Sequence, residues 1–171
     1  MPFEFATATR ILFGAGTCSQ VAPAALEMGQ RVLLVTGTQS ERAGTLCEQL
    51  ADQGLAVISY GVGGEPTIET IDAGVTRARE NGCDMVIGFG GGSVLDAGKA
   101  IAVLLTNAGQ PLDYLEVIGR GQSIAHHAAP YIAVPTTAGT GAEVTRNAVL
   151  GSTEHRVKVS LRSPLMLPRL A

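Results

Sequence analysis

The chain has 171 residues, of which 46% are hydrophobic, 16% charged and 4% aromatic. Its net charge of -3 comes without a cluster of lysine or arginine, which argues against a nucleic-acid-binding surface. No stretch approaches the roughly 20 apolar residues of a membrane-spanning helix, and the N-terminus lacks a signal-peptide pattern, so we expect no membrane contact. Three widely spaced cysteines predict free thiols and a cytoplasmic protein rather than a disulfide framework.

Short β-branched runs alternate with helical periods over the first 135 residues. A first strand is predicted at 10–13, where it ends at a Gly-Ala-Gly turn. The periodicity then predicts strands at 31–36, 55–60, 85–89 and 131–134, and helices at 18–28, 40–53, 67–81 and from Ser93 to about 106. Thr67 is placed to cap the helix that follows it. Because the runs at 31–36 and 85–89 are almost entirely apolar, we expect both strands to be buried on both faces.

The C-terminal part of the chain has a different pattern. Residues 107–130 predict a loop with one helical turn near 112–115, and 146–150 with 156–161 predict a β-hairpin. The whole predicts an α/β fold with a doubly wound, mostly parallel, Rossmann-like sheet and a β-hairpin near the C-terminus. We expect one domain over 1–171, with its core at 10–135 and a threonine-rich loop and hairpin at 135–162. In such folds ligands bind beyond the carboxyl ends of the strands.

The strongest local signal is a triple-glycine turn between a buried strand and a helix. Its residues Gly90, Gly91 and Gly92 let the backbone approach a ligand closely, and the helix start after Ser93 favours an anion such as a pyrophosphate. Ser93 and Asp96 also have the spacing of a capping box, so Asp96 either caps this helix or hydrogen-bonds a ribose or substrate hydroxyl. The turn matches neither a Walker P-loop nor the ordinary G-x-G-x-x-G fingerprint.

A second polar turn follows the strand at 131–134 and concentrates hydroxyl groups and glycines. Its threonines Thr136, Thr137 and Thr140 either stabilise a turn or line a cleft with the triple-glycine turn, since both segments follow neighbouring strand ends.

The two motifs together, FGGGSVLDAGKA at 89–100 and VPTTAGTGAEVT at 134–145, resemble the iron-containing (group III) alcohol dehydrogenase family. The resemblance implies a nicotinamide dinucleotide as ligand, with its pyrophosphate at Gly90, Gly91, Gly92 and Ser93. It also implies that Asp96 lies near the nicotinamide end, where it is the one candidate for a catalytic group. The threonines Thr136, Thr137 and Thr140 would line the adenine and ribose side. Lys158 would reach a ribose, unless it is only a solvated charge on the hairpin.

The choice of cofactor depends on the end of the strand at 31–36. Gly37 stands where NAD-preferring family members tend to carry an aspartate, so this position has room and no negative charge. Thr38 and Ser40 offer hydroxyl donors and Arg42 a nearby positive charge. We therefore expect NADP(H) to be preferred over NAD(H), although Gly37 could also serve only a tight turn.

The family's iron or zinc is held by a second, helical domain, which we do not expect in this chain, and no metal ligand is predicted. His126, His127 and His155 lack metal-ligand spacing and are interpreted as surface residues. The expected function is that of an NAD(P)-dependent alcohol dehydrogenase in a truncated form without its metal domain. Alternatives are a nucleotide-binding module without turnover and a relative of dehydroquinate synthase. A homodimer is expected, with a strand at 4–8 available for edge pairing.

Overall fold

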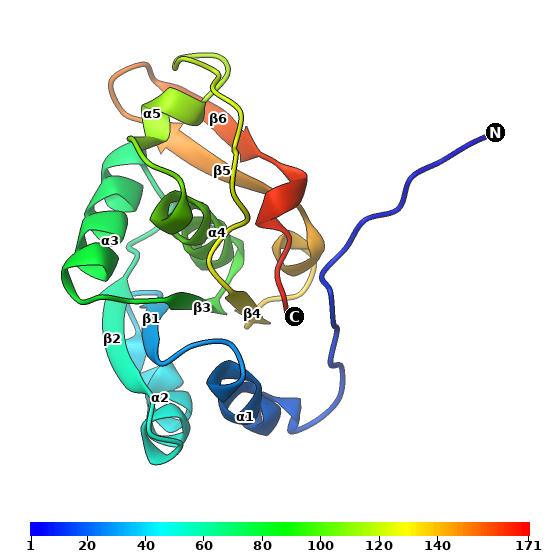
Figure 1. Ribbon diagram of the computed structural model, residues 1–171, viewed down its shortest axis with the longest axis vertical. Helices are drawn as coiled ribbons and strands as arrows, with labels where there is room; N and C mark the ends of the chain where they lie inside the picture. Colours follow the sequence, from blue (N-terminus) through cyan, green and yellow to red (C-terminus); the bar gives the residue numbers. More distant parts are fainter.

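A four-stranded parallel sheet forms the centre of the computed structural model, in the order β2-β1-β3-β4 (Figure 1). The structure describes the backbone of residues 1–171 and every side chain except that of Ser40. The strands are β1 (Arg31–Thr36), β2 (Ala56–Gly61), β3 (Met85–Gly90) and β4 (Tyr131–Pro135). β1 and β3 take the inner positions because their side chains are apolar on both faces.

Helices cover both faces of this sheet. Val32 and Leu34 of β1 face α1 (Val21–Leu26) and α2 (Gly44–Asp52), whereas Leu33 and Val35 face α3 (Ile68–Glu80) and α4 (Gly92–Thr106). Successive strand residues point to opposite faces, so each inner strand contributes to two hydrophobic cores. Figure 1 shows α1 and α2 on one side of the sheet and α3 and α4 on the other. The predicted doubly wound α/β fold is therefore confirmed.

The antiparallel hairpin β5 (Asn147–Ser152) and β6 (Val157–Arg162) packs against the outer side of α4. α4 thus lies between the sheet and the hairpin, which explains why most of its residues are buried and why the buried ones, apart from Lys99, are apolar. The predicted helical turn is α5 (Pro111–Tyr114). Four short 3₁₀ helices complete the fold: η1 (Thr17–Gln20), η2 (Ser40–Ala43), η3 (Ala142–Val144) and η4 (Pro164–Met166).

Thr67 caps α3 as its position in the sequence predicted. The backbone N–H of Thr70 donates to the Thr67 hydroxyl at 3.2 Å. The helical stripe of Ile71, Val75 and Ala78 is buried against the sheet and α4. Among the described residues, no helix is both long and apolar enough to cross a bilayer.

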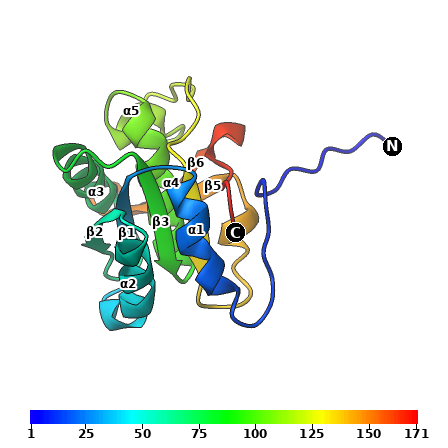
Figure 2. The ribbon, with the colours of Figure 1, turned by 60° about the horizontal axis from the view of Figure 1, so that its bottom comes forward.

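Two strands predicted near the N-terminus do not form. Residues 10–13 make only one parallel bridge, between Arg10 and Leu170, because they lie outside the four-stranded sheet and their backbone is linked to it only through the segment at 168–171. The described backbone of residues 1–8 belongs to no strand or helix. Figures 1 and 2 show this N-terminal arm projecting away from the body of the molecule, where it has no neighbouring strand to pair with.

Candidate functional site

The carboxyl ends of β1 and β3 lie side by side at the point where the strand order reverses. Thr36 of β1 is in register with Phe89 of β3, so Gly37 and Gly90 follow at the same edge of the sheet. Ligands of open α/β sheets bind at such a switch point, where the loops after the two strands diverge.

The triple-glycine turn leads directly from β3 into α4, whose N-cap residue is Gly91. None of its three glycines has a positive φ, so unusual backbone angles do not explain them. The explanation is close approach to neighbouring side chains. A Cβ atom on Gly92 would lie 3.0 Å from Thr140 Cγ2, and one on Gly91 would lie 3.3 Å from Thr137 Oγ1. The threonine-rich loop thus packs directly on the turn, and the structure brings the two predicted segments together.

Two hollows lie along this turn. One, of about 350 Å³, is lined by Gly92, Ser93, Asp96 and Thr140 together with Lys158 and Glu65 from the hairpin side. The other, of about 210 Å³, lies at the end of β1 and is lined by Gly37, Thr38, Gln39, Arg42, Phe89, Gly90, Gly91, Val94 and Thr136. The two hollows are lined by successive residues of the same two segments, with the positive end of the α4 dipole between them.

Asp96 does not cap α4, so the capping-box interpretation is wrong. The helix begins at Gly92, which places Ser93 inside the first turn, and the N-cap makes no side-chain hydrogen bond. The Asp96 carboxylate instead accepts a hydrogen bond from the Val149 N–H of β5 at 3.0 Å and pairs with Lys99 at 3.2 Å. With its side chain 15% exposed, Asp96 borders the larger hollow.

Lys158 reaches the same hollow from the hairpin. Its ammonium group forms an ion pair with Glu65, with 2.7 Å between Nζ and Oε1, and both side chains are at least half exposed. Lys158 is therefore a residue at the border of the larger hollow, with a carboxylate as its partner.

Gly37, Thr38 and Arg42 line the same smaller hollow, as expected if they bind the adenosine end of NADP(H). The residues that line it include no carboxylate, and Arg42 is their one charged side chain. The side chain of Ser40, also predicted here, lies outside the part of the chain that the structure describes.

Sequence reasoning missed Lys99 as a residue of this site. It is fully buried on α4, and its Nζ donates to the Asn147 carbonyl at 2.6 Å and the Thr145 hydroxyl at 3.1 Å. Burial lowers the pKa of this lysine, whereas the charges of Asp96 and Glu143 and the hydrogen bond to Asp96 raise it. The signal in the sequence was a single cation within the mostly apolar stretch at 97–105.

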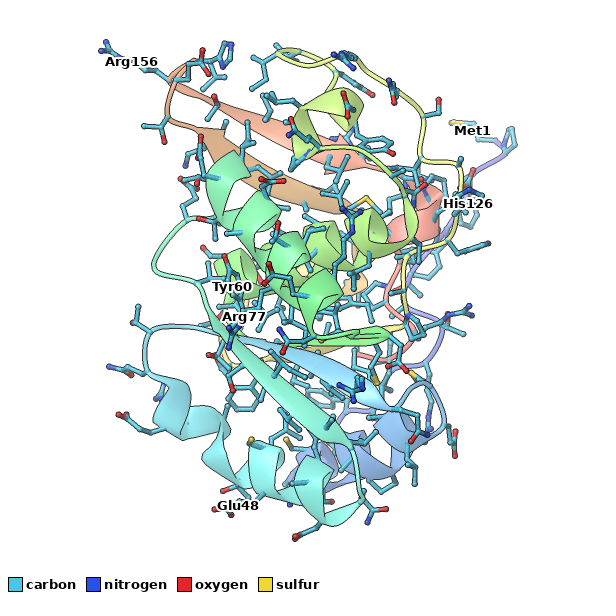
Figure 3. The ribbon with its side chains drawn as sticks, turned by 60° about the vertical axis from the view of Figure 1, so that its left-hand side comes forward. Met1, Glu48, Tyr60, Arg77, His126 and Arg156 are labelled. Atoms are coloured by element: carbon cyan, nitrogen blue, oxygen red, sulfur yellow. The ribbon has the colours of Figure 1, made fainter. Side chains whose placement is uncertain are left out.

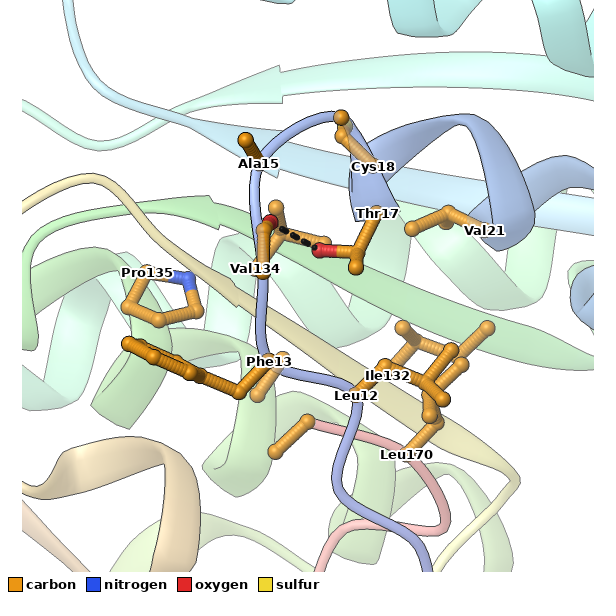
Figure 4. Close-up of a pocket in the computed structure, with 14 residues that line it drawn as sticks. Leu12, Phe13, Ala15, Thr17, Cys18, Val21, Ile132, Val134, Pro135 and Leu170 are labelled. Atoms are coloured by element: carbon orange, nitrogen blue, oxygen red, sulfur yellow. Dashed lines mark hydrogen bonds between the residues drawn. The ribbon is translucent and has the colours of Figure 1, made fainter.

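A third hollow, apolar and of about 530 Å³, was not predicted either. It lies between β4 and residues 12–18, and Leu170 and Ala171 also line it (Figure 4). Figure 4 shows Phe13 beside Pro135 at one side and Val21 of α1 at the other. Cys18 also lines it, and burial raises the pKa of that thiol.

Residues 8–171 match the family model of the iron-containing alcohol dehydrogenases. The chain belongs to the iron-containing alcohol dehydrogenase family. Its triple-glycine turn and threonine-rich loop, packed on each other beyond the sheet, are the segments on which the resemblance rested.

Relatives within this family are matched over only part of their length. The chain is 38% identical over 144 residues to 4-hydroxybutyrate dehydrogenase of Cupriavidus necator, covering 83% of this chain and 37% of the relative. Among solved structures, a 1,3-propanediol oxidoreductase superimposes with a TM-score of 0.90 at 30% identity, covering 99% of this chain and 45% of the other. A sulfoacetaldehyde reductase from Bifidobacterium kashiwanohense, solved with NAD⁺, gives 0.86 at 30% identity, covering 100% and 46%. The chain therefore spans about two fifths of the length of its relatives.

The family name implies iron, but the described residues do not fit a metal ion. They contain no group of three or more histidine, cysteine, aspartate or glutamate side chains placed to hold one. The three histidines are exposed, and Figure 3 shows His126 at the periphery of the molecule. His155 pairs instead with the Ser152 hydroxyl at 3.0 Å in the hairpin turn.

Proposed function

We propose that this chain binds a nicotinamide dinucleotide and supplies the cofactor-binding part of an NAD(P)-dependent alcohol dehydrogenase. The observation that carries the proposal is the position of the α4 N-terminus. It follows a glycine turn at the switch point of a parallel sheet, with a hollow on each side and a hydroxyl-rich loop packed over the turn. Backbone N–H groups at such a helix start favour a pyrophosphate.

Each predicted residue has a place in this proposal. Gly90, Gly91, Gly92 and Ser93 would hold the pyrophosphate at the helix start. Thr136, Thr137 and Thr140 would offer hydroxyls along the same cleft, since all three are exposed. Asp96 and Lys158 would stand beside the nicotinamide ribose in the larger hollow.

The bound nicotinamide would accept or donate the hydride when an alcohol and its aldehyde are interconverted. What the described residues of this chain do is bind and orient the dinucleotide. They supply no metal-ligand set, and we derive no step through a metal. We therefore propose that residues 1–171 bind the dinucleotide without appreciable turnover by themselves.

We propose that NADP(H) is preferred over NAD(H). An acidic residue at the end of the early strand would bind the adenosine ribose and repel a 2′-phosphate. Here the hollow at the end of β1 has Gly37, Thr38 and Arg42 and no carboxylate in its lining. A guanidinium group is well suited to a phosphate because it can donate two parallel hydrogen bonds.

We further propose that two copies of the chain associate. The large apolar side chains of Met1, Phe3 and Phe5 are almost entirely exposed on the N-terminal arm, and Phe13 is exposed beside the apolar hollow. Apolar surface of this kind favours a protein partner.

The three half-buried free cysteines support a reducing compartment, and we propose the cytoplasm.

Titration of the purified chain with NADPH, followed by nucleotide fluorescence, tests the proposed function. Gly92→Val should abolish most of the binding, since even a Cβ atom at this position would lie 3.0 Å from Thr140 and a larger side chain would obstruct the helix start. Gly61→Val is the matched control, because no atom lies within 4 Å of a Cβ added at that strand position. An unmodified chain that is folded by circular dichroism and shows no binding of either nucleotide would disprove the proposal.

A further inference from the structure

Lys99 is the one fully buried charged side chain among the described residues, and it joins three segments around the larger hollow. Its Nζ contacts the Asp96 carboxylate of its own helix, the Thr145 hydroxyl at the end of the threonine-rich loop and the Asn147 carbonyl at the start of β5. These three partners satisfy the three donors of an ammonium group. Lys99 itself does not line the hollow, so it does not face a ligand there.

The Asp96 carboxylate is held at both of its oxygens. Oδ1 lies 3.2 Å from Lys99 Nζ, and Oδ2 accepts the Val149 N–H at 3.0 Å. These contacts leave one edge of the carboxylate toward the hollow that Ser93 and Thr140 also border. Without the lysine, one oxygen would lose its partner and the carboxylate could rotate away from this position.

Burying the charge of Lys99 costs free energy that an apolar side chain at the same position would not. A buried ion pair can often be replaced by apolar side chains of similar volume without loss of stability, because removing charges from water is costly. The other buried residues of α4 are all apolar, so apolar side chains pack in the same layer as Lys99. A second carboxylate, Glu143, adds its charge to the surroundings of Lys99, and its Oε2 is buried without a hydrogen-bond partner among the described residues. The arrangement suits a role in the site better than a role in packing alone.

We propose that Lys99 is a positioning residue of the dinucleotide site, which orients the Asp96 carboxylate at the edge of the larger hollow. This inference rests on the proposed function, since it assigns Lys99 to the site that would bind the cofactor. Asp96 makes the contact with the bound dinucleotide, and Lys99 acts through Asp96.

A double-mutant cycle tests the inference. The affinities for NADPH and NADP⁺ are measured for four chains, which are the unmodified chain, Lys99→Met, Asp96→Asn and the double variant that carries both substitutions. Each single substitution should weaken binding at least about tenfold, whereas the double variant should bind no more weakly than the weaker single variant. Fold changes that multiply in the double variant would overturn the inference, because they would mean that Lys99 acts independently of Asp96.

The cycle stays decisive even where Lys99→Met does not fold. The comparison then runs between the double variant, which buries neither charge, and Asp96→Asn, in which the Lys99 ammonium keeps its hydrogen bonds to Thr145 and Asn147. Equal affinities support the inference, and a further loss in the double variant overturns it. Ile101→Val, on the same helix and away from the hollows, should lower the melting temperature without changing affinity. A folded, unmodified chain that binds neither nucleotide would instead overturn the proposed function and the inference with it.

Discussion

Gly98 of α4 faces the ring of Tyr131 on β4, a side chain that is 1% exposed and donates a hydrogen bond to the Leu95 carbonyl at 3.0 Å. A Cβ atom on Gly98 would lie 2.7 Å from Tyr131 Cε2, and the pinned ring has no room to move. Overpacking of this kind costs about 1–3 kcal/mol, of which a gain in helix propensity of about 1 kcal/mol offsets only part. We therefore expect Gly98→Ala to lower the free energy of unfolding in urea.

Gly44 provides the matched control for Gly98→Ala. It has helical backbone angles at the start of α2, and no atom lies within 4 Å of an added Cβ. Gly44→Ala should therefore leave stability unchanged or raise it by up to about 1 kcal/mol. Equal unfolding midpoints for both variants would show that contact with Tyr131 does not explain Gly98.

Cofactor choice is also decided at single residues. The unmodified chain should bind NADPH more tightly than NADH at fixed salt, because Arg42 and Thr38 offer donors and Gly37 brings no charge. Gly37→Asp should reverse the order, and Arg42→Ala should weaken NADPH binding about tenfold or more while leaving NADH unaffected. Tighter binding of NADH by the unmodified chain would contradict the argument from Gly37.

At the scale of the element, the start of α3 depends on one hydroxyl. Thr67→Ala removes the acceptor for the Thr70 N–H and should cost about 1 kcal/mol of stability, whereas Thr67→Ser should cost little. The backbone of this segment also bridges to Gly151 of the hairpin, a contact that neither substitution removes. The difference in unfolding free energy between Thr67→Ala and Thr67→Ser, measured by chemical denaturation, gives the contribution of the capping hydroxyl. Equal unfolding free energies for the two variants would mean that the cap contributes nothing.

At the scale of the whole molecule, the N-terminal arm leads us to expect self-association. Met1, Phe3 and Phe5 are alternate residues of an extended arm, so their side chains can share one face toward a partner. Light scattering over a wide concentration range should show a dimer. Removal of residues 1–7 should shift the protein to monomer, because the exposed apolar side chains of Met1, Phe3 and Phe5 are lost with them. A monomeric unmodified chain at all concentrations would refute this prediction.

The chain by itself should oxidise alcohols slowly or not at all, whether or not zinc or iron is added. The described residues offer no set of ligands that would place such an ion beside the dinucleotide. Absorbance of reduced nucleotide, measured with short primary alcohols, checks this directly. Turnover that disappears in Asp96→Ala would contradict it and make Asp96 a catalytic residue.

Much of this protein could be predicted from local sequence alone. Residues 31–36 form β1 with the predicted bounds, Thr67 caps α3, and the hairpin and the one-turn helix α5 appear where the pattern placed them. These features depend on neighbours within a few residues, because periodicity and capping are short-range properties. The glycine turn and the threonine-rich loop could also be chosen as site segments, since both follow strand ends.

Other features depend on contacts between segments far apart in the chain. A strand needs a partner, so residues 10–13 form a single bridge in spite of their strand-like sequence. Ser-x-x-Asp predicted a cap, but Asp96 turns to Val149 and Lys99 because β5 packs across α4 and presents an N–H to it. Lys99 is buried only because the hairpin packs across α4 and presents the Asn147 carbonyl to it. Local sequence patterns therefore predict most of the strands, helices and turns of this protein. The partners of the buried charges, and the failure of residues 10–13 to form a strand, depend on how the layers pack together.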